Sequence, residues 1–153
     1  MREPASGQRI TVLLVDDSPG DVRLTRDAFA EANPLVDLQV AYDGVEAMAY
    51  LNREGSLARA PRPDLILLDL NMPRMDGREV LAQIKADPRL QLIPTVILTT
   101  SDADADVAGS YQLRANSHLT KPVQLADFER LVRGISDFWL NTAKLPPRPA
   151  FTG

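Results

Sequence analysis

Short apolar runs alternate along the chain with longer segments in which apolar positions recur at helical spacing. The strand candidates, in chain order, are ITVLLV (10–15), DLQVA (37–41), LILLD (65–69), TVILT (95–99) and SHLT (117–120). Alternation of this kind predicts right-handed βαβ units and a parallel sheet. The first, third and fourth runs are apolar throughout, which is typical of central strands, whereas the second and fifth are more mixed and indicate edge strands.

The predicted helix starts share a pattern in which a capping residue is followed three positions later by an acid. The pattern occurs in SPGD (18–21), DGVE (43–46), DGRE (76–79) and SDAD (101–104). In the first of these, Ser18 is the predicted N-cap and Pro19 occupies the first helical position. Capping and the helix dipole sufficiently explain the acids of these four starts. We therefore assign no catalytic role to Asp43, Asp76, Asp102 and Asp104.

The last predicted helix, residues 124–141, is longer than a helix that only covers a sheet needs to be. Its apolar positions follow helical spacing on one face as far as Phe138 and Trp139, and Leu140 comes next. These three residues either close the bottom edge of the sheet or form a surface for a partner, because aromatic anchors are enriched at interfaces. We favour the partner surface.

Composition limits the possible function classes. The 153 residues suit one domain, which we place at 8–141, followed by a Pro-rich tail at 142–153. The net charge of -4 argues against nucleic acid or anionic membrane as a partner, since binding to phosphates needs clustered Lys and Arg. The absence of cysteine excludes disulfides and thiolate sites, and a single histidine, His118, excludes a multi-histidine metal site. No signal peptide or membrane-spanning run is present, so we expect a cytoplasmic protein.

Polar residues of the types that bind ligands or carry out catalysis follow the predicted strands. Asp16 and Asp17 follow the first strand, Asp69 ends the third, Thr99 ends the fourth, and Lys121 follows the fifth. Ligand sites of open parallel sheets lie at the carboxyl ends of the strands, where the strand order reverses. With strand order 2-1-3-4-5, the first and third strands are neighbours, and the three carboxylates converge.

Three converging carboxylates need a cation. Two unit charges about 4 Å apart repel by roughly 4 kcal/mol at a surface-like dielectric. An all-oxygen ligand set suits a hard cation, Mg²⁺ above all. Lys121 and a threonine hydroxyl add a positive charge and a donor, both suited to phosphate, and a carboxylate beside Mg²⁺ has the chemistry to form an aspartyl-phosphate.

With these motifs the chain resembles the receiver domain of two-component response regulators. The resemblance covers roughly residues 8–141, and it is carried by LLVDDSPGD (13–21), LILLDLNMPRMDG (65–77), VILTTS (96–101) and LTKPV (119–123). It implies a flavodoxin-like (βα)5 three-layer sandwich with strand order 2-1-3-4-5. A narrower resemblance, to stand-alone regulators paired with phytochrome-type histidine kinases, is carried by SPGDVRLTRDAF, APRPD, TTSDADADV and DFWL.

The resemblance implies a role for each matching residue. Asp69 would accept the phosphoryl group from a kinase phosphohistidine. Asp17 and Asp69 would ligate Mg²⁺ together with the backbone carbonyl of Asn71, and Asp16 would act mainly through a metal-bound water. The resemblance thus predicts a phosphoacceptor signalling protein rather than an enzyme with turnover, apart from Mg²⁺-dependent phosphorylation and dephosphorylation of itself.

Three further residues complete the implied site. Thr99 would bond a phosphoryl oxygen in the active state. Lys121 would pair with Asp69 and then with its phosphate. The family also has a cis peptide bond before the position of Pro122. The output would be protein binding, either docking to another protein or homodimerisation through the last helix and the tail.

Two positions depart from the family pattern. Receivers usually carry Tyr or Phe as a rotamer switch three residues before the lysine, and here that position is His118. The imidazole either fills the same space or makes the switch weaker or dependent on pH, because histidine titrates near neutrality. The second departure is Arg114, where the family commonly has a helix-capping glycine. We expect either a strained Arg114 or a shifted helix end, with no direct effect on chemistry.

Two other functions fit parts of the same pattern. One is a Mg²⁺-dependent phosphohydrolase that uses Asp69 as nucleophile. Such enzymes typically carry a general acid two residues later, where this chain has Asn71, which does not protonate a leaving group. The other is a flavodoxin, but its FMN phosphate would meet too many acids in the loop DDSPG.

Overall fold

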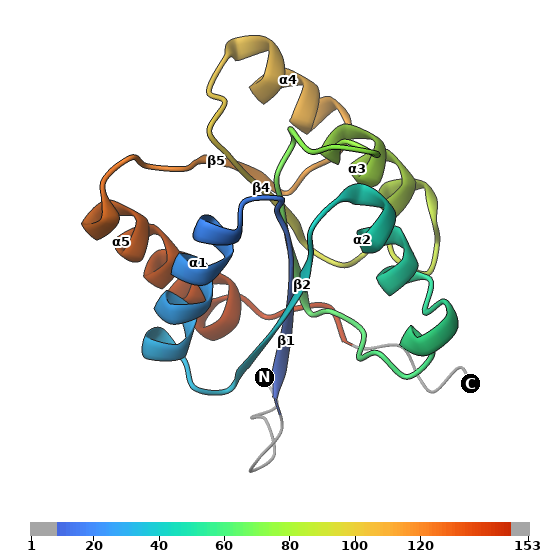
Figure 1. The fold of residues 1–153 in the computed structure, drawn as a ribbon, viewed down its shortest axis with the longest axis horizontal. Coiled ribbons are helices and arrows are strands. Elements are labelled where there is room, and N and C mark those ends of the chain that lie inside the picture. Colours follow the sequence, from blue (N-terminus) through green and yellow to red (C-terminus); the bar gives the residue numbers. More distant parts are fainter. Residues whose placement is uncertain (1–8, 148–153) are drawn as a thin grey trace.

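The fold is built on a parallel sheet of five strands. The computed structural model describes residues 9–147, so residue 8 of the predicted domain and residues 148–153 of the predicted tail lie outside the described residues. The strand order is β2-β1-β3-β4-β5, as expected (Figure 1). The strand bounds are β1 Ile10–Val15, β2 Val36–Ala41, β3 Leu65–Leu68, β4 Thr95–Thr99 and β5 Ser117–Thr120.

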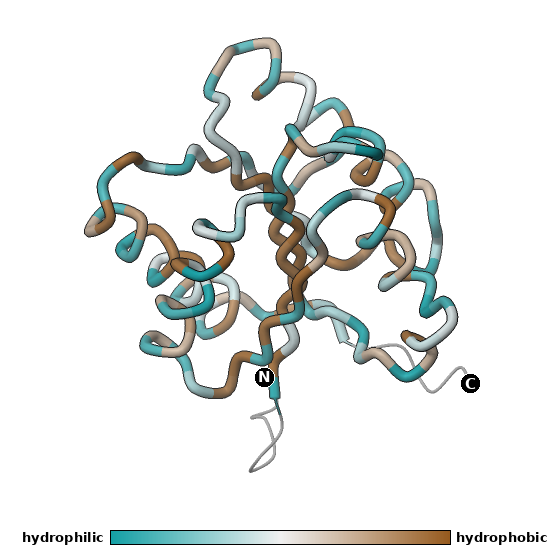
Figure 2. Tube along the Cα trace, in the orientation of Figure 1, coloured by the Kyte–Doolittle hydropathy of each residue, from teal (hydrophilic) through white to brown (hydrophobic). Residues whose placement is uncertain are grey.

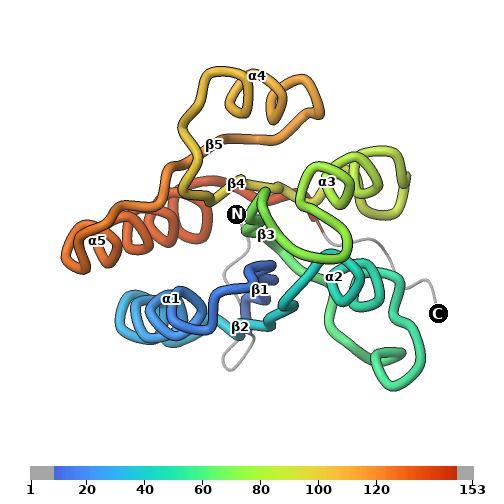
Figure 3. Tube along the Cα trace, turned by 45° about the horizontal axis from the view of Figure 1, so that its top comes forward, coloured from blue at the N-terminus to red at the C-terminus, as the bar shows by residue number. Residues whose placement is uncertain are grey.

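The helices lie on both sides of the sheet. Figure 3 shows α1 and α5 together on one side and α2 and α3 on the other, with α4 beside β5. The three-layer, flavodoxin-like arrangement is therefore confirmed. The helix bounds are α1 Pro19–Ala32, α2 Gly44–Leu51, α3 Gly77–Ala86, α4 Asp104–Gln112 and α5 Leu125–Ile135, with a 3₁₀ turn at Gly55–Leu57 and a π-helical segment at Ser136–Thr142.

The central strands have apolar side chains on both faces because helices cover both faces. Leu13 and Leu68 pack in the cluster under α2 and α3, while Leu14 and Leu67 pack in the cluster under α1 and α5. The hydrophobic centre of the sheet is visible in Figure 2. Side chains of successive strand residues point to opposite faces, so one continuous apolar run supplies both clusters.

Three of the four predicted helix caps are present. The side chains of Ser18, Asp43 and Asp76 accept hydrogen bonds from backbone N–H groups of the first turns of α1, α2 and α3. The fourth prediction was wrong. The residue before α4 is Ala103, which has no side-chain cap, and the hydroxyl of Ser101 donates instead to the carboxylate of Asp106.

Two backbone expectations have different outcomes. Arg114 has a φ of 72°, so the prediction of a strained residue after α4 is confirmed. The prediction of a cis bond before Pro122 is wrong, because no peptide bond among residues 9–147 is cis.

The last helix follows the predicted path, but its α-helical part ends at Ile135 and wider π-helical turns continue to Thr142. Within the described residues, no helix has both the length and the apolar character required to cross a bilayer.

Candidate functional site

Three carboxylates meet at the carboxyl end of the sheet. Val15 at the end of β1 pairs with Leu68 at the end of β3, so the next residues, Asp16 and Asp69, emerge side by side. The N–H of Asp69 donates to the carbonyl of Val15 at 2.9 Å, which continues the pairing past the strand end. One carboxylate oxygen from each of Asp16, Asp17 and Asp69 lies within 4.8 Å of the others. The predicted acidic convergence is therefore present.

A tight turn after Asp69 supports this arrangement. The N–H of Gly77 donates to the carbonyl of Leu70 at 2.8 Å, and a Cβ at position 77 would lie only 2.0 Å from the carbonyl oxygen of Asp69. Only glycine fits this approach. Arg74, with a φ of 68°, ties the turn to the start of α2 through a 2.6 Å ion pair with Asp43.

Asn71 lies at the start of the same turn. It is exposed, and its N–H is 3.4 Å from Oδ1 of Asp69, which is a long and weak hydrogen bond. The role predicted for Asn71 depends on its backbone carbonyl oxygen as a metal ligand, so the exposed side chain is free to vary without changing that ligand.

Lys121 connects the carboxylates. Its Nζ lies 2.6 Å from Asp16, 2.9 Å from Asp21 and 3.2 Å from Asp69. The backbone N–H of Lys121 donates to the carbonyl of Thr99 at 2.7 Å, which fixes the lysine beside the end of β4. The contact between Asp21 and Lys121 was not predicted from the sequence, since the position of Asp21 at the start of α1 already explained that acid. The signal was available: Asp21 lies in the first turn of α1, which begins shortly after Asp16 and Asp17, and helical side chains lean toward the N-terminus.

The pKa shifts show which charges the site favours. Burial, the largest effect, raises the pKa of Asp16 above its usual value, and the hydrogen bond and charge of Lys121 offset only part of this rise. Burial alone would lower the pKa of Lys121, but the hydrogen bonds and charges of Asp16, Asp21 and Asp69 raise it overall. Lys121 is therefore a permanent cation. Its charge does not fully offset the effect of burial on the pKa of Asp16.

The acidic cluster fits a divalent cation. Its ligand atoms are all oxygens, and Asp17 is exposed while Asp16 and Asp69 are buried, so one side of the cluster is open to solvent. Such a set suits a hard cation that keeps part of its water shell. A divalent cation would also add positive charge beside Asp16, where the charge of Lys121 only partly offsets the effect of burial.

Thr99 presents an unused donor near this edge. Its side chain is fully buried, and among the described residues its Oγ1 has no hydrogen-bond partner. An unpaired buried hydroxyl costs about 1–3 kcal/mol, so it usually signals a missing partner. The hydroxyl fits the predicted role of a donor to an anionic group bound at Asp69.

His118 is held by contacts to the α4 side of the sheet. It pairs with Ile97 of β4, two residues before Thr99, so His118 and Thr99 belong to the same face. Its Nδ1 lies 3.0 Å from the hydroxyl oxygen of Ser110, and its Nε2 lies 3.0 Å from the carbonyl oxygen of Ser101. The imidazole thus connects β5 to α4 and to the loop before α4.

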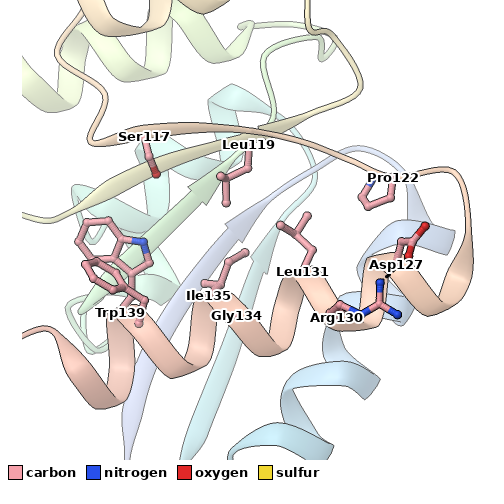
Figure 4. A pocket seen from close by; sticks show the side chains of 10 residues that line it. Ser117, Leu119, Pro122, Asp127, Arg130, Leu131, Gly134, Ile135 and Trp139 are labelled. Carbon is pink, nitrogen blue, oxygen red and sulfur yellow. Dashed lines mark hydrogen bonds and ion pairs between the residues drawn. The ribbon is translucent and has the colours of Figure 1, made fainter.

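A second feature is an apolar groove between β5 and α5. Figure 4 shows its lining side chains, among them Leu119, Leu131 and Trp139. The groove has a volume of about 540 Å³. Phe138 is 53 % exposed and meets Trp139 edge to face, with ring centroids 5.2 Å apart. Leu140, the third residue of the predicted partner surface, is only 8 % exposed and packs into the core.

Comparisons with known proteins agree with this site. The pattern of the response regulator receiver domain matches residues 12–133. The response regulator Rcp1 of Synechocystis sp. is 48 % identical over 135 residues, which make up 88 % of this chain and 92 % of Rcp1.

Two solved structures share the fold. The phosphorylated cyanobacterial phytochrome response regulator RcpA has a TM-score of 0.88 and 48 % identity, covering 91 % of this chain and 99 % of RcpA. The Mn²⁺-bound form of Rcp1 has a TM-score of 0.86 and 47 % identity, covering 90 % of this chain and 99 % of Rcp1. The matched residues, the strand order and the acidic edge show that this chain belongs to the response regulator receiver domain family.

Proposed function

We propose that Asp69 accepts a phosphoryl group from a phosphohistidine of a sensor histidine kinase. The observation that carries this proposal is the meeting of Asp69 with Asp16, Asp17 and Lys121 at one sheet edge. A carboxylate oxygen of Asp69 would form the new bond to phosphorus as the phosphorus–nitrogen bond breaks. The electron pair of that bond stays with the departing imidazole of the kinase.

Mg²⁺ is the proposed cation of the site. Asp17, Asp69 and the carbonyl of Asn71 would hold it, and Asp16 would act mainly through a metal-bound water. The bound ion would supply positive charge against the transferred phosphoryl oxygens. The all-oxygen acidic cluster supports this assignment, and the Mn²⁺-bound Rcp1 structure shows a divalent ion in a relative.

Lys121 and Thr99 would receive the phosphoryl group. Lys121 is 3.2 Å from Asp69 and would pair with the phosphate after transfer, since its charge is permanent. The unpaired hydroxyl of Thr99 would donate to a phosphoryl oxygen. Slow hydrolysis of the aspartyl-phosphate by water would return the protein to its resting state, so the chain would act as a timed switch with only self-directed chemistry.

The kinase is proposed to be phytochrome-type. The support is the likeness to RcpA, which is described as a phytochrome response regulator. The same proposal places the protein in the cytoplasm with the kinase domain that phosphorylates it. The alternative of a phosphohydrolase is not favoured, because Asn71 occupies the position of the general acid and the chain belongs to a signalling family.

Incubation with acetyl phosphate and Mg²⁺, followed by mass spectrometry, tests the phosphoacceptor. We expect the wild type to gain one phosphoryl group on Asp69 and Asp69→Asn to gain none. Asp102→Asn, which removes an exposed acid, is the matched control and should behave like the wild type. An unmodified wild type, or equal modification of Asp69→Asn, would contradict the proposal.

We also propose that the output is homodimerisation through the end of the last helix and the following segment. The exposed ring of Phe138 at an apolar groove supports this surface. Arg130 and Asp127 form an exposed ion pair at its rim, so the patch carries both signs of charge. A two-fold dimer places a patch against its own copy, which requires such self-complementarity.

A further inference from the structure

The loop between β4 and α4 is fixed at Ser101 by two separate contacts. Nε2 of His118 lies 3.0 Å from the carbonyl oxygen of Ser101. The hydroxyl of Ser101 donates to Oδ2 of Asp106 in the first turn of α4. Ser101 is two residues beyond Thr99, and Thr100 between them is exposed, so a shift of Thr99 toward the acidic edge would pull directly on Ser101.

Asp106 extends this contact to a third element. Its other carboxylate oxygen, Oδ1, accepts a hydrogen bond from Arg78 of α3 at 2.6 Å. The hydroxyl of Ser101 and then the guanidinium of Arg78 lower the pKa of Asp106 below its usual range, so the carboxylate remains charged. Arg78 is in turn near the N-cap of α3, Asp76, at 3.7 Å, which ties the network to the end of the turn that follows Asp69.

The imidazole of His118 closes the network on the α4 side. The carbonyl of Ser101 only accepts hydrogen bonds, so Nε2 must carry a proton to bond with it. Nδ1 faces the hydroxyl of Ser110, which also bonds the backbone carbonyl of Asp106 at 2.8 Å. The side chain therefore connects β5 to both Ser101 and the turn that presents Asp106.

We propose that Asp106 is a positioning residue of the switch, which together with His118 holds the β4–α4 loop where the Thr99 hydroxyl is unpaired. The inference rests on the proposed function and names how that site is regulated. When a phosphoryl group on Asp69 offers a partner to Thr99, the loop moves and the Ser101 contacts break. A hydrogen-bonded network around His118 thus takes the switching role that an aromatic side chain usually has in the family.

Breaking the network costs free energy, and this cost lowers the affinity of the site for a phosphoryl group. Weakening the network should therefore tighten the binding of a phosphoryl analogue. For the probe beryllofluoride with Mg²⁺, we expect Asp106→Asn to lower the dissociation constant about threefold, which is the scale of a partly exposed ion pair. The matched control is Asp104→Asn, which removes the same charge from an exposed residue of the same helical turn and should leave the constant unchanged.

Arg78→Gln should act in the same direction as Asp106→Asn, and the double variant should add little to either single change. A second readout is nuclear magnetic resonance of His118, whose ring signals are unique because the chain has one histidine. Addition of beryllofluoride to the wild type should shift these signals, and Asp106→Asn should shift them beforehand.

The results separate this inference from the proposed function. If the wild type binds beryllofluoride and forms the Asp69 adduct, but Asp106→Asn behaves like Asp104→Asn or the His118 signals stay fixed, the positioning role is overturned while the phosphoacceptor remains. If the wild type neither binds beryllofluoride nor forms the adduct, the proposed function fails and this inference fails with it.

Discussion

At the scale of single residues, Arg114 carries a backbone cost that glycine would avoid. Its φ of 72° lies in the left-handed region, which costs a non-glycine residue about 1–2 kcal/mol. Its side chain is exposed, so little contact is lost on truncation. Because glycine also makes the unfolded chain more flexible, we expect Arg114→Gly to raise the free energy of unfolding by only about 0.5–1 kcal/mol.

Chemical denaturation of three proteins would check this expectation. Arg114→Ala is the matched control, since it removes the same side chain but keeps the Cβ that causes the strain. The alanine variant should be no more stable than the wild type. Equal stabilisation by alanine and glycine would show that the arginine side chain, rather than the backbone, is responsible.

The sequence predicted some site residues and missed others for a physical reason. Asp16, Asp69 and Lys121 follow strand ends directly, so the strand order alone brings them together. Asp21 and Asp106 lie within helices, where their contacts depend on the direction of each side chain. A local explanation, capping and the helix dipole, was sufficient for Asp21 and concealed its ion pair with Lys121.

At the scale of elements, Tyr50 joins α2 to the loop before β3. Its hydroxyl donates to the carbonyl of Pro61 at 2.7 Å, and its side chain is buried. Burial, the main cause, raises the pKa of Tyr50 from 10.0 to about 12. Between these two values the phenol ionises in the unfolded chain but not in the folded one. The contribution of Tyr50 to the free energy of unfolding is therefore complete below pH 10 and falls as the pH rises toward 12.

Urea denaturation of wild type and Tyr50→Phe from pH 7 to pH 11 tests this contact. At neutral pH the variant should be less stable by about 1 kcal/mol, the net value of one hydrogen bond. The difference should shrink above pH 10 because only the wild type loses the contribution of Tyr50. Tyr42→Phe, at an exposed tyrosine, controls for general alkaline effects. A difference that stays constant with pH would refute the assigned pKa.

Elements were predicted best where a periodic pattern and a local signal agree. The strand runs are apolar and short, and the caps of α1, α2 and α3 follow from side chains next to their own helix. The start of α4 was misplaced because the Ser101 hydroxyl bonds Asp106 instead of a backbone N–H. The π-helical turns after Ile135 bury Ser136 and Leu140 and leave Phe138 exposed, whereas the α-helical period predicted that Phe138 continues the apolar face.

At the scale of the whole molecule, the acidic edge and the proposed dimer surface belong to different parts of the fold. The acidic edge lies where β1 and β3 end, whereas the groove runs between β5 and α5 (Figure 4). Lys121 and Pro122 follow β5 directly, and Pro122 lines the groove. A change at Lys121 therefore has a short covalent path to the surface on which we expect a second copy to bind.

Light scattering with and without beryllofluoride and Mg²⁺ tests this dimer. We expect the wild type to form dimers with the analogue present, and Phe138→Ala to raise the dimer dissociation constant at least about tenfold, as loss of an interface aromatic anchor does. Phe138 is suited to this test because its exposed ring contributes little to the core, whereas Trp139→Ala would also remove core packing. Leu92→Ala, at a 67 % exposed side chain outside the groove, is the control for general loss of apolar surface. A wild type that stays monomeric with the analogue, or a dimer as tight in Phe138→Ala and Trp139→Ala as in Leu92→Ala, would show that the signal leaves the molecule through another surface.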